Sequence, residues 1–114
     1  MRDKLNVFFA SPLRNTWLTS KPVSVYVRKG YHLGSDNKPH HYLDIANIEV
    51  EAFCRRQGHF KTFLALCQQI QPYDGIKCET VLNNLLYHYL QHIAEEDPRW
   101  IECGMDFFWE KWRD

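Results

Sequence analysis

The junction between residues 48 and 60 has the strongest chemical character in the chain. An alternating, strand-like run ends there, a short basic turn follows, and apolar residues then recur at helical spacing. The first N–H groups of a helix have no intrahelical partner and lie at the positive end of its dipole, so they can bind an anion. Gly58 would let the backbone approach that anion closely. Positive charge would come from Arg55, Arg56 and Lys61. This arrangement predicts a pyrophosphate site. The alternative is that Gly58 is only a tight-turn residue and that the arginines form a solvated surface.

Other residue patterns do not indicate metal or nucleophile chemistry. His88 and His92 are four residues apart on a predicted helix, a spacing that can hold zinc, but Tyr89 stands where a metalloprotease needs Glu. The four cysteines show no Cys-x-x-Cys spacing, which disfavours a zinc site. Because the N-terminus lacks the features of a signal peptide, we expect free thiols and a cytoplasmic protein without a metal. The cysteines are Cys54, Cys67, Cys78 and Cys103.

Length and composition describe one globular domain spanning residues 1–114. The chain balances 14 Lys and Arg against 14 Asp and Glu, which disfavours a nucleic-acid binder that works by bulk electrostatics. Its apolar runs are too short to span a membrane. Seven Phe, six Tyr and four Trp supply enough apolar surface for a folded core and exclude disorder. We therefore expect no nucleic-acid or membrane partner.

Two alternating runs must position the junction. Residues 23–28 and 42–51 alternate along the chain and are rich in β-branched side chains, as strands are. The turn-forming run 34–39 is expected to join them as an antiparallel hairpin. Strict alternation places Asp44 and Val50 on the same face of the second strand.

The remainder of the chain alternates helices and strands. Residues 59–70 have helical apolar spacing, 76–83 predict a short strand, and 84–94 predict a second helix. The aromatic-rich tail, 100–112, predicts one or two strands, whereas residues 6–10 fit either a short strand or a helical turn. The fold class is therefore α/β (α+β), with a mixed, mostly antiparallel sheet and a strand–loop–helix phosphate site at its centre.

This order of elements and the junction resemble the GNAT superfamily of acyl-CoA-dependent N-acyltransferases. The phosphate loop of that family has Gln or Arg, two residues, Gly, one residue, and then Gly or Ala. Arg55 and Gly58 match its first and fourth positions, and Phe60 stands at its last. Val50 occupies the place of an apolar strand residue whose backbone, in the family, faces the acyl carbonyl and the pantetheine arm.

A second motif extends the resemblance over residues 22–94. Val81-Leu82-Asn83, followed by Leu86 and Leu90, is similar to the family's next strand, which ends in an Asn that opens the following helix. The resemblance implies a site for acetyl-CoA made by residues of the junction and by this Asn. These residues are Ile48, Val50, Arg55, Arg56, Gln57, Gly58, His59, Phe60, Lys61 and Asn83.

An N-acyl transfer also needs proton chemistry. A base must take a proton from the attacking ammonium, and an acid can protonate the leaving thiolate. On the resemblance, Asp44 lies where some family members keep a Glu base; otherwise it is a surface residue near a strand start. Tyr89 lies near the position where the resemblance places the acid, although Leu90 occupies the family's Tyr position itself. The alternative is that Tyr89 is a core residue.

The sequence thus predicts an N-acetyltransferase that binds acetyl-CoA and transfers the acetyl group to an amine acceptor, either a protein or a small molecule. The alternative is a catalytically silent GNAT-like domain that binds another protein as an inhibitory or accessory factor, for example a phage-encoded one. Gly58 and the adjacent arginines favour retained binding of CoA. Phe60 and Leu90 favour the silent alternative.

Overall fold

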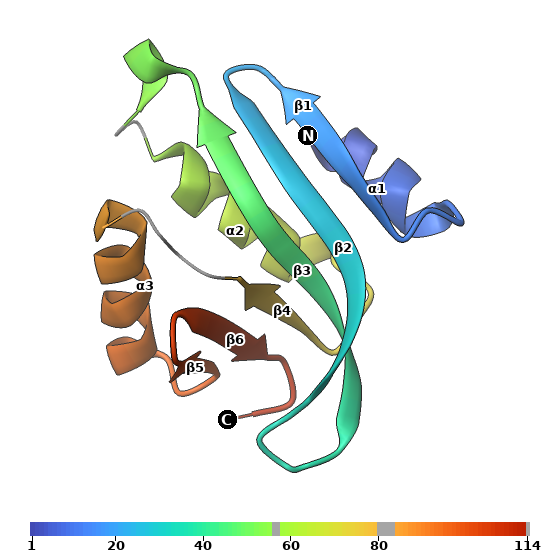
Figure 1. Cartoon of the computed structure of the whole chain (residues 1–114), viewed down its shortest axis with the longest axis vertical. Coiled ribbons are helices and arrows are strands. Elements are labelled where there is room, and N and C mark those ends of the chain that lie inside the picture. The colour runs from blue at the N-terminus through green and yellow to red at the C-terminus, as the bar shows by residue number, and fades with distance from the viewer. Residues whose placement is uncertain (56–57, 80–83, 114) are drawn as a thin grey trace.

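The computed structural model describes residues 1–55, 58–79 and 84–113 (Figure 1). Its elements, in chain order, are α1 (Arg2–Ala10), β1 (Asn15–Ser20), β2 (Val23–Leu33), β3 (Pro39–Val50), a 3₁₀ turn η1 (Ala52–Cys54), α2 (His59–Ile70), β4 (Gly75–Cys78), α3 (Asn84–Glu96), β5 (Trp100–Cys103) and β6 (Asp106–Glu110).

Six strands form one mixed sheet in the order β1-β2-β3-β4-β6-β5. Strand β3 is central: it pairs antiparallel with β2 and parallel with β4. The other pairs, β1 with β2, β4 with β6 and β5 with β6, are antiparallel. The predicted mixed, mostly antiparallel sheet with one parallel pair at its centre is confirmed, as is the helix that begins directly after Gly58.

Of the two forms considered for residues 6–10, the N-terminal segment has the helical one, and the helix is longer than a single turn. It belongs to a nine-residue helix, α1, in which Leu5 and Phe8 are three residues apart and both buried. The helix ends at Ser11, whose N–H donates to the carbonyl of Phe8, and Pro12 follows. Strand β1, which the sequence did not predict, then forms the sheet edge.

Two other elements have different boundaries from those predicted from the sequence. The strand expected over residues 76–83 spans only Gly75–Cys78, and residues 80–83 lie outside the described residues. The following helix begins at Asn84, as predicted, and continues to Glu96, just before the Asp97-Pro98 turn. The tail forms two strands, β5 and β6, around a turn at Gly104, whose φ is +63°.

One face of the sheet carries the hydrophobic core. Side chains paired across neighbouring strands share a face, so Val27, Ile45 and Cys78 align from β2 to β4 and Phe107 continues the row on β6. All three helices contribute buried residues to the same cluster: Leu5, Phe8, Phe63, Leu64, Cys67 and Leu90. The molecule is 21 Å thick along its shortest axis, as expected for one sheet covered by one layer of helices.

The opposite face, here called the open face, has a charged centre. Arg28, Asp44, Lys77 and Phe108 pair in that order across β2, β3, β4 and β6, so they form one row on it. Within the described ranges, the buried helical positions all belong to the core on the first face, which leaves the open face without helix cover.

A β-bulge in β3 decides which residues reach each face. The pairing between β2 and β3 shifts between Tyr26 and Val27, which leaves Ala46 as an extra residue in β3. Because one extra residue reverses the alternation, Val50 lies on the core face and Asp44 lies on the open face. The prediction that these two residues share a face is therefore wrong.

Strand β4 pairs with only the first part of β3. Their pairing runs from Tyr42 opposite Gly75 to Ile45 opposite Cys78, with one further backbone bond of 3.0 Å from Glu79 N–H to the carbonyl of Ile45. Strand β3 continues to Val50, and its arrowhead end extends well beyond β4 in Figure 1. Beyond Ile45, the end of β3 that leads into α2 has no partner in the described part of β4.

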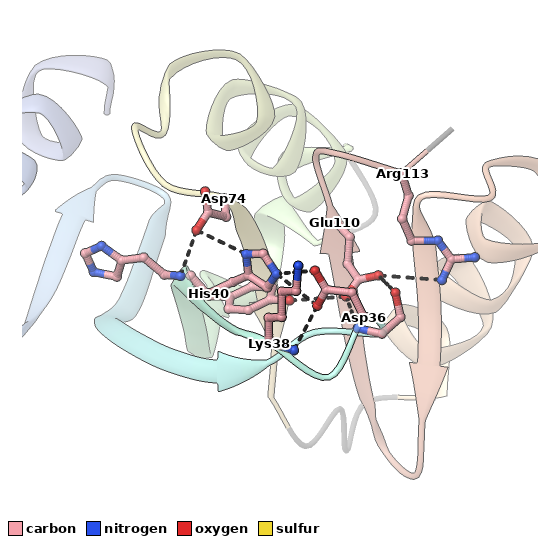
Figure 2. A network of polar contacts seen from close by, with 9 residues as sticks. Asp36, Lys38, His40, Asp74, Glu110 and Arg113 are labelled. Atoms are coloured by element: carbon pink, nitrogen blue, oxygen red, sulfur yellow. Dashed lines mark hydrogen bonds and ion pairs between the residues drawn. The ribbon is translucent and has the colours of Figure 1, made fainter.

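The other end of the sheet is closed by the tip of the β2–β3 hairpin. Figure 2 shows Glu110 of β6 reaching this tip, where it accepts hydrogen bonds from the Ser35 N–H at 2.8 Å and the Ser35 hydroxyl at 2.5 Å. His40 lies between Asp36 at 2.8 Å and Asp74 at 3.4 Å, and its ring stacks on Trp112. These contacts join the hairpin to both β4 and the C-terminal segment.

Candidate functional site

A cavity of 710 Å³ lies beside the end of β3 and the start of α2. Its size is within the usual range for small-molecule sites, and most of its lining side chains are apolar or cationic. The lining residues are Ile48, Val50, Cys54, Arg55, Gly58, His59, Phe60, Lys61, Leu86 and Tyr89.

Three elements build this cavity. The end of β3, beyond its pairing with β4, contributes Ile48 and Val50. The bulge places both side chains on the face that the helices cover. The first turn of α2 contributes Phe60, and α3 contributes Tyr89; their rings meet edge to face at 6.0 Å. This contact joins the two helices at the cavity wall, so Phe60 has a packing role at the position where the sequence pattern favoured a smaller residue.

Gly58 has a left-handed conformation at the start of α2, with φ +77° and ψ +17°. Its carbonyl accepts the first hydrogen bond of the helix, 3.0 Å from the Thr62 N–H. A Cβ at this glycine would meet no protein atom within 4 Å, so it would occupy open space beside the helix N-terminus. The N–H groups of that first turn are the donors that an anion would use.

Two cations flank this helix start. Arg55 is exposed, and its Nε donates to the carbonyl of Val50 at 3.2 Å, which folds the side chain over the end of β3. Lys61 is exposed on the first turn of α2. Neither cation has a carboxylate partner among the ion pairs of the described residues, so both charges are available to an anionic ligand.

The structure brings most of the sequence-predicted site residues into this one cavity. They are Ile48, Val50, Arg55, Gly58, His59, Phe60, Lys61 and Tyr89. Three others, Arg56, Gln57 and Asn83, lie outside the described residues. Cys54 and Leu86 also line the cavity, although they were not predicted as site residues. Both lie within the two sequence motifs, so their position next to predicted site residues was the signal that could have identified them.

Asp44 does not line the cavity; it lies on the open face and is 3% exposed. Its two carboxylate oxygens are 2.9 and 3.0 Å from Nε2 of His32. Burial raises the pKa of the Asp44 carboxyl, and the charges of His32, Lys77 and Arg28 oppose that shift. Asp44 is thus a buried, partnered carboxylate rather than a surface residue near a strand start.

Tyr89 is half-buried in the cavity wall, and burial raises the pKa of its phenol above the ordinary value. The phenol is therefore uncharged at neutral pH, and its hydroxyl can donate a hydrogen bond. All four cysteines are free: Cys67 and Cys78 are buried, as expected for Cys67, while Cys54 is half-buried and Cys103 is exposed.

No group of three metal-ligating side chains occurs in residues 1–55, 58–79 and 84–113. None of the helices in the same ranges is long and apolar enough to cross a membrane. No family model, curated protein or solved structure matches the chain.

Proposed function

We propose that this protein binds acetyl-CoA and transfers the acetyl group to an amine. The observation that carries the proposal is the cavity itself, because a free strand end, a left-handed glycine, a helix N-terminus and two cations line one space. The topology supports it as well, since a helix joins the two parallel central strands in the order that the GNAT resemblance implies.

The parts of coenzyme A fit the parts of the cavity. The pyrophosphate would lie at the N-terminus of α2, where Gly58 leaves room and Arg55 and Lys61 supply charge. The pantetheine arm carries two amide groups and would extend along β3 beyond Ile45, where β4 no longer accompanies the strand. Ile48 and Val50 would contact its apolar carbons.

The reaction requires three proton movements. The amine must first lose its ammonium proton, and we assign that proton to Asp44. The neutral amine nitrogen then attacks the thioester carbonyl and loses its second proton to solvent, the C–S bond breaks, and the CoA thiolate takes a proton that Tyr89 can donate and then recovers from solvent. The products are an amide, CoA and one proton released to solvent.

Calorimetric titration tests the binding step, and release of free CoA tests the transfer step. We expect acetyl-CoA and CoA to bind with similar affinity, because both carry the pyrophosphate and the pantetheine arm. We expect CoA release with at least one member of an amine panel containing a lysine peptide, a free N-terminal peptide and spermidine. Absence of acetyl-CoA binding would refute the proposal. Binding without transfer to any amine would favour the catalytically silent alternative.

A further inference from the structure

The carboxylate of Asp44 has an unusual setting for a residue in the middle of a sheet. Its row neighbours Arg28 and Lys77 face it from β2 and β4, and His32 contacts it from the far part of β2. Both row cations also have other partners: Arg28 pairs with Glu79, and Lys77 lies 3.8 Å from Glu79. His32 is the group that contacts both oxygens of Asp44.

Further contacts fix this pair. The His32 ring packs against Tyr42 at 5.5 Å and edge-on against Phe108 at 6.0 Å between ring centroids. Gly30 lies two residues before His32, and a Cβ there would be 2.4 Å from Oδ2 of Asp44 and 2.8 Å from Nε2 of His32. The absence of a side chain at residue 30 therefore provides the space in which imidazole and carboxylate meet.

We infer that His32 is the positioning residue of Asp44: it orients the carboxylate, and its positive charge favours the ionised form that can act as a base. The inference rests on the proposed function. It follows from the contact of Nε2 with both carboxylate oxygens and from the packing of the His32 ring against Tyr42 and Phe108.

The substitution His32→Gln separates charge from hydrogen bonding. The Gln amide can occupy the place of Nε2 and donate to Asp44, but it cannot become a cation. Without the cation, burial of Asp44 is less opposed, so its ionisation moves to higher pH. We expect the acidic limb of the kcat/KM profile to move up by about one pH unit, the lower end of the range for loss of an adjacent opposite charge.

The substitution His32→Lys keeps a positive charge and should leave the acidic limb at or below its wild-type position. The control is His92→Gln, on the exposed face of α3, where the side chain pairs only with Glu96 in the described part of the chain. This control should match the wild type. Acetyl-CoA affinity, measured by calorimetry, should be unchanged in all three variants because none of these residues lines the cavity.

The outcomes are separable. The inference is supported if the acidic limb of the kcat/KM profile shifts to higher pH in His32→Gln and lies at or below its wild-type pH in His32→Lys. Equal pH profiles for the wild type and both folded variants overturn it while the proposed function stands. Wild-type protein that binds acetyl-CoA but acetylates no amine of the panel overturns it too, because no ammonium proton is then taken up. Failure of the wild type to bind acetyl-CoA refutes the proposed function itself.

Discussion

Two glycines of this chain allow the effect of a ligand clash to be separated from the effect of backbone strain. Gly58 and Gly104 both have positive φ, +77° and +63°, and a Cβ at either would meet no protein atom within 4 Å. Gly58 lines the cavity, whereas Gly104 lies in the turn between β5 and β6. Alanine at either position should therefore cost the same in stability and differ in its effect on binding.

The magnitudes follow from backbone and binding energetics. A left-handed conformation costs alanine ~1–2 kcal/mol, and the lower entropy of the unfolded alanine chain offsets part of this. We expect each variant to lose about 1 kcal/mol of unfolding free energy, or ~4–8 °C in Tm. In Gly58→Ala the Cβ would also occupy the space of the phosphate oxygens. Its Kd for acetyl-CoA and for CoA should rise at least about tenfold, which corresponds to about 1.4 kcal/mol.

Calorimetry on the folded variants, with Tm measured in the same buffer, decides the matter. We expect matched Tm losses, weaker binding in Gly58→Ala and wild-type Kd in Gly104→Ala. Wild-type affinity in folded Gly58→Ala would mean that Gly58 is only a turn residue and that the anion site is elsewhere. Equal weakening in both variants would mean that global stability, rather than a clash, governs the affinity.

Three other outcomes follow from the structure. Asp44→Asn should lower kcat by about 10²–10⁴-fold with little change in acetyl-CoA affinity; unchanged turnover would remove this carboxylate from the mechanism. In native protein, alkylation monitored by intact mass should modify the exposed Cys103 first and spare Cys67, because burial raises the pKa of the Cys67 thiol well above its ordinary value. The unfolded chain should take four adducts. The hydrogen bond between His40 and Asp36 raises the pKa of the imidazole and lowers that of the carboxyl. The stability contributed by the imidazole is lost as pH rises through its raised pKa, and that contributed by the carboxyl is lost as pH falls through its lowered pKa. The Tm difference between wild type and His40→Gln should thus be largest between about pH 4 and 6.5, and a pH-independent difference would contradict the ion pair.

Local patterns were sufficient to predict the central strands, the hairpin and the helix after Gly58. These features depend on residues that are close in sequence: alternation with period two, a turn-forming run and apolar residues at helical spacing. The same local order explains why the predicted junction residues lie together beside one cavity, because those from Ile48 to Lys61 belong to one strand–turn–helix unit.

The errors have a common origin in contacts that the local pattern does not encode. One inserted residue, Ala46, changed the face of Asp44, and no residue type marks a bulge of this kind in an alternating run. The short helix α1 is stabilised by burial of Leu5 and Phe8 in a distant core, so its own sequence left strand and helix equally open. The partner of Asp44, His32, is twelve residues away and reaches it only through the pairing of β2 with β3.

The charged row on the open face also bears on how the protein behaves at high concentration. An uncovered sheet face normally invites a second sheet to stack against it. Here such stacking would remove water from Arg28 and Lys77 at the centre of the contact, and desolvation of charges can cost more than their mutual attraction returns. The row therefore acts as a gatekeeper against face-to-face aggregation, and neutral substitutions along it are expected to lower solubility even where they leave the fold intact.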